Sequence, residues 1–397
     1  MPNFAQRMLD MEPTAKIIRG LFNAMSDADT ISFGGGAPAK EGLPVDIVRE
    51  ICNDVLTTEK RGMEALQYGS VLGVLDLRQA VADVLLAPKG MQASVDELLI
   101  VNGGLETMNL LCQVYINPGD VILVESPTFV HCVEIFEMFQ AKCIAVECDA
   151  DGMQMEDLEE KIQQYHPKMV YVIPTFQNPT GKTLPTERRK KMAELGSQYD
   201  VIILEDDPYQ ELRYSGEVLP PIKCFDQTGH TVYANSFSKI FSPGSRLGYV
   251  YADKEIIIRL FDAKTATNSH TSTLAQVICA EFFRRGYYPE HLKKICAIHR
   301  ERRDAMMACI EKYFPEGTKK VYPDGGLFTW VELPGKINTT ELLKEANERK
   351  VHYIAGEGFF VEGNGKGQNC MRISFGNVTP EQIEIGMKRL GDLICSK

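Results

Sequence analysis

The sequence has no excess of basic residues, no long apolar run and no paired cysteines. Its 43 basic residues are outnumbered by 54 acidic ones, and a net charge of −11 argues against nucleic-acid binding, which usually needs a basic face. No apolar run approaches the ~20 residues of a transmembrane helix, and the opening MPNFAQRMLDMEPT lacks the apolar segment of a signal peptide. We therefore expect a soluble protein that handles small metabolites.

The eleven cysteines form no CxxC pair and no cysteine–histidine cluster with zinc spacing. Several of them lie inside apolar runs such as LLCQV and QVICA, which indicates buried, reduced thiols. We therefore expect no metal site, and we expect the reducing environment of the cytoplasm.

From about residue 97, short apolar runs alternate with segments of helical period. The strand-like runs are ELLIV, DVILVE, KCIAVE, KMVYVI, VIILE, TVYAN and LGYVYA. Continuous apolar strands that alternate with helices indicate an α/β fold, here with a mostly parallel seven-stranded sheet between helices. After residue 253 a long helical region and then an α+β pattern follow. We expect a large domain over residues 45–285 and a smaller α+β domain made of residues 1–44 and 286–397.

The most unusual local sequences follow four of these strands, namely NGGLET, PTFQNPTG, DDPY and SFSK. Ligands of open α/β sheets bind outside the carboxyl ends of the strands, so these four segments should converge on one crevice. Each has an ordinary explanation when taken alone. The glycines could form a plain turn, Asn178 could be a turn residue, and the carboxylates around Asp206 could be solvated.

Lys239 differs from most lysines because it follows a buried strand, has serines, phenylalanines and a Pro-Gly turn around it, and has no carboxylate nearby. Burial disfavours the charged form and lowers the pKa, so this amine could form a Schiff base with an aldehyde. Arg246 offers a planar fork suited to phosphate, and the helix start after Gly103 offers free N–H groups. With an aspartate to keep a pyridine nitrogen protonated, these residues predict a site for pyridoxal phosphate (PLP).

The order of the motifs resembles that of a known family. NPTG, DxxY, SxSK with an arginine seven residues later, and a late RISF are similar to the fold-type I PLP-dependent aminotransferases of class I/II, above all the 2-aminoadipate, kynurenine and aromatic aminotransferases. Further counterparts extend over nearly the whole chain, including ISFGGGAP, QYGSVLGVLDLRQAV and GGLFTWVELP. The resemblance implies a homodimer with the PLP-dependent transferase fold. It also implies ping-pong transfer of an amino group from an L-α-amino acid to a 2-oxo acid, with 2-oxoglutarate as the expected acceptor.

The resemblance also implies a role for each matched residue. Lys239 would bind the cofactor covalently and shuttle the proton, and Asp206 would pair with the pyridine nitrogen. Asn178 and Tyr209 would hydrogen-bond the ring oxygen, and Phe129 would stack on the ring. The phosphate would be held by Gly103, Gly104, Leu105, Ser236, Ser238 and Arg246. Tyr68 would reach the phosphate of the neighbouring subunit. Arg372 would clamp the substrate α-carboxylate, with help from Gly36 and Asn178.

Three positions depart from the family pattern. Relatives often carry Ser-Gln where this chain has Gly104-Leu105, so one hydroxyl to the phosphate is missing while the backbone donors remain. Relatives often carry an arginine near SxIR, and Lys16 or Arg19 would stand in for it in EPTAKIIRGL. Ala355 occupies a position where proline is common. The preferred amino donor therefore stays open.

Two other functions stay open as well. A β-eliminating C–S lyase would use the same site residues, and pyruvate release from cystathionine without an oxo acid would identify it. A PLP-sensing transcription regulator would carry an N-terminal winged helix-turn-helix, for which we expect no room because ISFGGG begins at residue 31.

Overall fold

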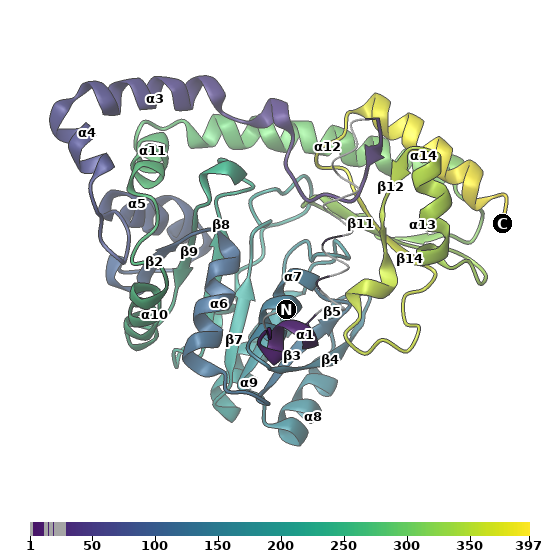
Figure 1. Ribbon diagram of the computed structural model, residues 1–397, viewed down its shortest axis with the longest axis horizontal. Helices are drawn as coiled ribbons and strands as arrows, with labels where there is room; N and C mark the ends of the chain where they lie inside the picture. The colour runs from purple at the N-terminus through teal and green to yellow at the C-terminus, as the bar shows by residue number, and fades with distance from the viewer. Residues whose placement is uncertain (1–2, 12–14, 16–18, 20–28) are drawn as a thin grey trace.

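The computed structural model describes residues 3–11, 15, 19 and 29–397. Its centre is an eight-stranded sheet in the order β2-β9-β8-β7-β6-β3-β4-β5 (Figure 1). The strands are β2 (Leu98–Val101), β3 (Val121–Ser126), β4 (Lys142–Asp149), β5 (Gly152–Met153), β6 (Met169–Val172), β7 (Ile202–Asp206), β8 (Thr231–Ser236) and β9 (Gly248–Tyr251). All neighbours from β8 to β4 pair in parallel, and β9 is antiparallel to both of its neighbours. The expected α/β class with a mostly parallel sheet is confirmed.

The sheet has one strand more than the seven expected from the sequence. β5 contains only two residues and forms a short antiparallel hairpin with the end of β4. Gly152 makes this turn possible with a φ of 93°, which glycine adopts readily. A two-residue strand contains no apolar run, so nothing in the sequence marks it.

Helices cover both faces of the sheet because alternate strand residues point in opposite directions. Met169 and Tyr171 of β6 pack in one buried cluster with side chains of α6 and α7, whereas Val170 and Val172 pack with side chains of α8 and α9. The helices up to residue 284 are α1 (Gln6–Asp10), α3 (Val45–Thr57), α4 (Glu59–Leu66), α5 (Leu75–Ala80), α6 (Gly104–Tyr115), α7 (Val130–Met138), α8 (Met155–Tyr165), α9 (Thr186–Tyr199), α10 (Lys254–Thr267) and α11 (Thr273–Arg284). Shorter helical turns cover Lys40–Gly42, Val81–Leu86, Ala87–Lys89, Val95–Glu97, Ile222–Phe225, Pro243–Ser245 and Gly356–Phe359.

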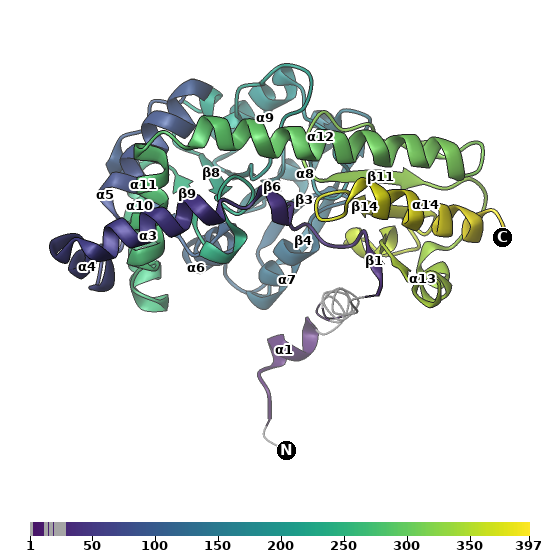
Figure 2. The ribbon, with the colours of Figure 1, turned by 90° about the horizontal axis from the view of Figure 1, so that it is seen from above.

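The C-terminal part forms a second, antiparallel sheet in the order β10-β11-β14-β13. Its strands are β10 (Lys319–Lys320), β11 (Phe328–Glu332), β13 (Ile354–Ala355) and β14 (Cys370–Ser374). β1 (Ile31–Ser32) pairs in parallel with β12 (Val351–His352), which joins the N-terminal segment to this part. α12 (Tyr288–Tyr313) runs along the length of the molecule and packs on α14 (Pro380–Ile394) (Figure 2). α13 (Thr339–Glu348) packs on α14 and on β12.

Among the described helices, none is long and apolar enough to cross a membrane.

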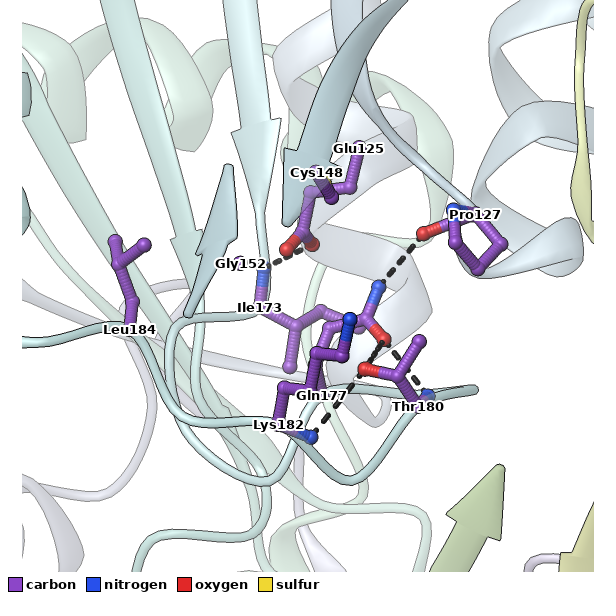
Figure 3. Close-up of a pocket in the computed structure, with 9 residues that line it drawn as sticks. All are labelled: Glu125, Pro127, Cys148, Gly152, Ile173, Gln177, Thr180, Lys182 and Leu184. Atoms are coloured by element: carbon purple, nitrogen blue, oxygen red, sulfur yellow. Dashed lines mark hydrogen bonds between the residues drawn. The ribbon is translucent and has the colours of Figure 1, made fainter. Parts of the chain in front are cut away.

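The loop after β6, which carries Asn178, is held in place by the side chain of Gln177 (Figure 3). Its Nε2 donates to the carbonyl of Pro127 at 2.8 Å, and its Oε1 accepts from the backbone N–H of Thr180 at 2.8 Å and from the Thr180 hydroxyl at 2.6 Å. Gln177 thus satisfies the polar groups of a buried turn and fixes the position from which Asn178 points.

Glu125, near the end of β3, borders a small cavity beneath this loop (Figure 3). The cavity volume is about 10 Å³, close to the smallest space that holds one water, so it cannot hold a cofactor. The Glu125 Oε2 accepts a hydrogen bond from the Ile173 N–H at 2.9 Å. Burial outweighs this bond and raises the pKa of Glu125 to about 8.

Glu125→Gln should flatten the dependence of stability on pH. In the unfolded chain this carboxyl loses its proton near pH ~4.3, whereas in the folded chain it keeps the proton until about pH 8. Stability contributed by the group is therefore complete below the unfolded pKa and is lost as pH rises between these values, by up to about 1.4 kcal/mol per pH unit. Urea unfolding from pH 5 to 8.5 measures the slope.

The amide introduced by this substitution would keep the shape of the protonated acid without titrating, and the exposed Glu160→Gln serves as the control. Other buried acids, including Glu205 and Asp207, also have raised pKa values, so only the difference between wild type and Glu125→Gln isolates this group. Equal slopes for wild type and Glu125→Gln would contradict the assignment of a protonated Glu125.

Candidate functional site

The strand ends that carry the unusual sequences meet at one edge of the large sheet. Gly248, the first residue of β9, pairs with Val101 at the end of β2 and with Ser236 at the end of β8. A Cβ on Gly248 would lie 2.9 Å from the Gly103 carbonyl carbon and 3.0 Å from the Gly104 nitrogen. Only glycine allows this approach, which brings the loop after β2 against the loop after β8.

Lys239 lies in the turn after β8, and its amine points toward the N-terminal segment. The Nζ donates to the Gly36 carbonyl at 2.7 Å and lies 6.0 Å from the centre of the Tyr209 ring. Burial, followed by the positive charges of Arg246 and Arg372, lowers the pKa of Lys239 to about 8. The lowered pKa expected from the sequence is confirmed, and the amine is neutral often enough near neutral pH to act as a nucleophile.

Arg372, on β14, is a buried guanidinium that pairs with no carboxylate among the described residues. It stacks on the rings of Phe328 and Phe359, with its Cζ 4.4 and 5.2 Å from the ring centres. Its Nη1 donates to Asn178 Oδ1 at 2.7 Å, and its Nη2 donates to the Gly34 carbonyl. Its buried Nε has no partner among the described residues, and burial lowers its pKa to about 10.

Burying such a cation without a counter-ion costs free energy, because its hydrogen bonds to water are lost and must be replaced. The guanidinium remains charged at neutral pH and presents a free N–H, so it is suited to receive a carboxylate from a ligand. The Asn178 contact also links this cation to the loop after β6, and Asn178 lies within hydrogen-bonding reach of Tyr209.

The start of α6 and Arg246 form a cradle for an anion. Gly103 is the N-cap residue, with a φ of 77° and no side chain with which to cap the first turn. The Arg246 guanidinium lies against it, since a Cβ on Gly103 would fall 2.4 Å from Nη2. The Ser236 hydroxyl accepts from the Ser238 N–H at 3.2 Å. Free helix N–H groups, hydroxyls and a guanidinium are the donors that bind phosphate.

Asp206 ends β7 and is the acidic residue of EDD that faces the crevice. Its Oδ2 accepts a hydrogen bond from the Tyr171 hydroxyl at 2.9 Å, while burial raises its pKa to about 7. Glu205 instead caps the backbone N–H groups of Ile222 and Lys223 on the other side of the strand. All three carboxylates are buried, so the alternative of solvated loop carboxylates is wrong.

The remaining candidates lie at the margin of the site. Phe129 is half-buried at the start of α7, with its ring stacked on His131 at 5.2 Å between centres, and Leu105 packs on the core. Burial and the charge of Arg372 lower the pKa of His131, which the sequence did not single out. A Cβ on Gly36 would lie 2.9 Å from the Phe328 ring.

Tyr68 is not brought into the crevice of its own chain. Its side chain is 87% exposed and packs edge-on against His270, with ring centres 5.7 Å apart. Arg19 is exposed, and Lys16 lies outside the described residues. Ala355 lies in β13, paired with Met371 of β14.

These groups fit PLP by their chemistry. The cradle offers donors to a phosphate, the Lys239 amine has a lowered pKa suited to an aldehyde, and Asp206 has one oxygen, Oδ1, that accepts from no described residue. Tyr209 and Asn178 can bond a ring oxygen between these points. The Arg372 Nε, which has no partner among the described residues, is free to bond a ligand carboxylate.

Gly104→Ser should tighten PLP binding by roughly tenfold, because its hydroxyl would add one hydrogen bond to a charged phosphate. The new Cβ would lie 3.7 Å from the Ser236 Cβ, an ordinary contact, and Gly104 has no positive φ to strain. Gly103→Ala is the opposing control, since its Cβ would displace Arg246 and its φ of 77° disfavours alanine. Fluorescence titration of apo-protein with PLP measures both, and unchanged or weaker binding by Gly104→Ser would overturn this reading of the cradle.

Known proteins are similar to this chain in both sequence and fold. The model of the family "Aminotransferase class I and II" matches residues 29–390. An aromatic-amino-acid aminotransferase of Thermococcus litoralis is 40% identical, with 98% of this chain and 94% of the relative covered. A crystal structure of Pyrococcus horikoshii kynurenine aminotransferase with PMP superposes with a TM-score of 0.92 at 36% identity, over 99% of this chain and 97% of that one.

A second solved structure extends the likeness. The alpha-aminoadipate aminotransferase of Thermus thermophilus, complexed with a phosphopyridoxyl-leucine, has a TM-score of 0.90 at 29% identity, over 99% of this chain and 97% of that one. The sequence and the structure are thus similar to known aminotransferases over nearly the whole chain. The chain therefore belongs to the class I and II aminotransferases, and it is an aminotransferase whose cofactor is pyridoxal phosphate.

Proposed function

We propose that the chain transfers the amino group of an L-α-amino acid to 2-oxoglutarate in a ping-pong reaction, with Lys239 as the catalytic amine and Arg372 as the carboxylate clamp. The observation that carries this proposal is the buried Arg372, whose Nε lacks a partner among the described residues. Its Nη1 donates to Asn178, which lies within hydrogen-bonding reach of Tyr209. Relatives act on aromatic amino acids, kynurenine and alpha-aminoadipate by name. We infer donors of these kinds for this chain.

The residues divide the work of the reaction between them. When bound, PLP supplies an aldehyde and a ring that withdraws electrons from the substrate. Lys239 Nζ would take the proton from the substrate Cα, hold it, and give it back in the second proton transfer. Arg372 fixes the substrate carboxylate, so that the Cα–H bond stands where Lys239 can reach it, and such positioning can contribute several kcal/mol. The carboxylate of Asp206 holds the proton on the ring nitrogen.

The remaining site roles belong to the same proposal. Asn178 and Tyr209 bond the ring oxygen, and Phe129 stacks on the ring. Gly36 helps to hold the substrate. The phosphate is held by Gly103, Gly104, Leu105, Ser236, Ser238 and Arg246.

Lys239→Ala should reduce transamination by at least about 10³-fold, because the nucleophile and the proton carrier are lost together. The measurement is an absorbance half-reaction, in which PLP-loaded protein converts its cofactor to the amino form on addition of each common amino acid, aminoadipate or kynurenine. Lys254→Ala, on an exposed helix start, is the control and should behave as wild type. Undiminished turnover by Lys239→Ala would contradict the proposal. Release of pyruvate from cystathionine without an oxo acid would favour the β-eliminating lyase.

We propose further that two copies of this chain form a homodimer with shared sites. The helices α3 and α4 project at one end of the molecule (Figure 1). This arm and its neighbourhood expose the large apolar residues Val45, Leu56, Met63, Leu66, Tyr68 and Leu75. Arg246 is exposed on the open side of its cradle, where a second copy could add a donor. Burial of this apolar surface by a partner would favour association.

In such a dimer, Tyr68 bonds the phosphate in the partner's cradle. Tyr68→Phe should weaken PLP binding by about tenfold through loss of a hydrogen bond to a charged acceptor. Mixing Tyr68→Phe with Lys239→Ala protein should then restore one intact site per mixed dimer, with wild-type affinity and turnover. No recovery in a mixture shown to exchange subunits would rule out the shared site, and a monomer by sedimentation would rule out the dimer.

We also propose a division of the chain into a large unit, residues 45–285, and a small unit, residues 1–44 with 286–397. The pairing of β1 with β12 supports this division, and domain motion between ligand-free and ligand-bound crystals would test it.

We propose that the protein is located in the cytoplasm. Eleven free cysteines, all among the described residues, support this location. Cell fractionation tests this location.

A further inference from the structure

Tyr171 is a buried tyrosine in the middle of the large sheet that neither the motifs nor the proposed function uses. It lies on β6, is fully buried, and packs edge-on against Phe136 with ring centres 5.6 Å apart. A buried phenol needs a hydrogen-bond partner for its polar tip. Its partner is Asp206, since the Tyr171 Oη donates to Asp206 Oδ2 at 2.9 Å across the β6–β7 pair.

A second donor fixes the direction of this hydroxyl. Cys132, in the first turn of α7, donates from its Sγ to the Tyr171 Oη at 3.1 Å. The phenol oxygen therefore accepts one hydrogen bond from the thiol and donates one hydrogen bond to the carboxylate. Burial raises the pKa of Tyr171 and of Cys132 well above their ordinary values, so both remain donors throughout the pH range of the protein.

The two carboxylate oxygens of Asp206 have different hydrogen-bond surroundings. Oδ2 is occupied by Tyr171, while Oδ1 accepts from no described residue. The titratable groups that act on Asp206 or are acted on by it are Glu125, Cys132, Tyr171, Asp207 and Tyr209. Of these, the Tyr171 hydroxyl is the one that stabilises the ionised carboxylate, whereas burial and the nearby Asp207 oppose ionisation.

We propose that Tyr171 is a positioning residue, which favours the ionised form of Asp206 and turns its free oxygen toward the ring nitrogen of the cofactor, and that Cys132 orients Tyr171. This inference rests on the proposed pairing of Asp206 with that nitrogen. Without the hydroxyl, Asp206 binds a proton more tightly, so the proton of the ring nitrogen moves onto the carboxyl. The ring then withdraws electrons less strongly, and proton removal from the substrate slows.

The test is the protonation of the ring nitrogen, read directly by NMR of protein loaded with ring-¹⁵N-labelled PLP. Wild type should show the protonated nitrogen from pH 6 to 8. Tyr171→Phe keeps the ring that packs on Phe136 and should shift the signal toward the unprotonated position within this range. Loss of a hydrogen bond to a carboxylate corresponds to roughly a tenfold change in proton affinity or more.

Tyr233→Phe is the matched control, because it also removes a buried tyrosine that donates to an aspartate. Tyr233 donates to Asp207 Oδ2 at 3.1 Å, and Asp207 lies one residue beyond the site carboxylate. This control should leave the ring-nitrogen signal unchanged. A ring nitrogen in Tyr171→Phe that stays as protonated as in wild type would overturn the proposal, as would an equal shift in Tyr233→Phe.

Cys132→Ala provides a second route to the same conclusion if Tyr171→Phe fails to fold. It removes only the thiol that orients the phenol and should give a smaller shift of the same sign, with an unchanged signal counting against the proposal. Failure of the proposed function would look different. In that case wild type itself would show no protonated ring nitrogen or would not convert amino acids, whatever the variants did.

Discussion

The site depends on two buried cations, Arg372 and Lys239, with which no carboxylate pairs among the described residues. Arg372 is held between two phenyl rings and bonded only to an amide oxygen and a carbonyl, with its Nε unpartnered among the described residues. Lys239 is bonded to a carbonyl, and its pKa is lowered by burial and by two guanidinium groups. Carboxylates beside these groups would neutralise them and block the ligand. The cost of the bare charges is recovered when the ligand brings its own anions.

The fold concentrates these charges because strand ends far apart in the sequence meet at one sheet edge. Gly248 lets the loops after β2 and β8 approach to van der Waals contact, and Gln177 fixes the turn that presents Asn178. The paired strands β7 and β8 therefore hold Asp206 and the turn that carries Lys239. Arg372 comes from β14 of the smaller antiparallel sheet, much later in the sequence. These supports rest on sheet pairing, close backbone approach and a buried side chain, which hold the site residues more rigidly than a surface loop would.

Much of this could be predicted from the sequence because the parallel strands are continuous apolar runs and the ligand-binding segments follow them directly. Lys239 stood out by its lack of charged neighbours, and Gly103 by its place before a helix. β5 could not be predicted, since two residues make no pattern. Tyr171 was missed because a tyrosine in an apolar strand looks like core, and only its pairing with Asp206 across the sheet gives it a further role.

Other features lie beyond what spacing can express. The sequence cannot show that the Arg372 Nε is left without a partner among the described residues or that Gly34 accepts from the same group, because the second contact joins residues more than 300 positions apart. The exposure of Tyr68 is likewise a property of the folded chain. The ring contact between Phe129 and His131 also follows from tertiary packing.

The Arg372 guanidinium, whose Nε has no partner among the described residues, should bind the carboxylate of the ligand. Calorimetric titration of the PLP-loaded protein with a 2-oxo acid and with its carboxamide tests this claim most directly, since the two ligands differ only in the anion. The account predicts that the carboxamide binds at least about a hundredfold more weakly, because it replaces a charge-assisted pair with a neutral contact. Equal affinities for the acid and the amide would contradict it.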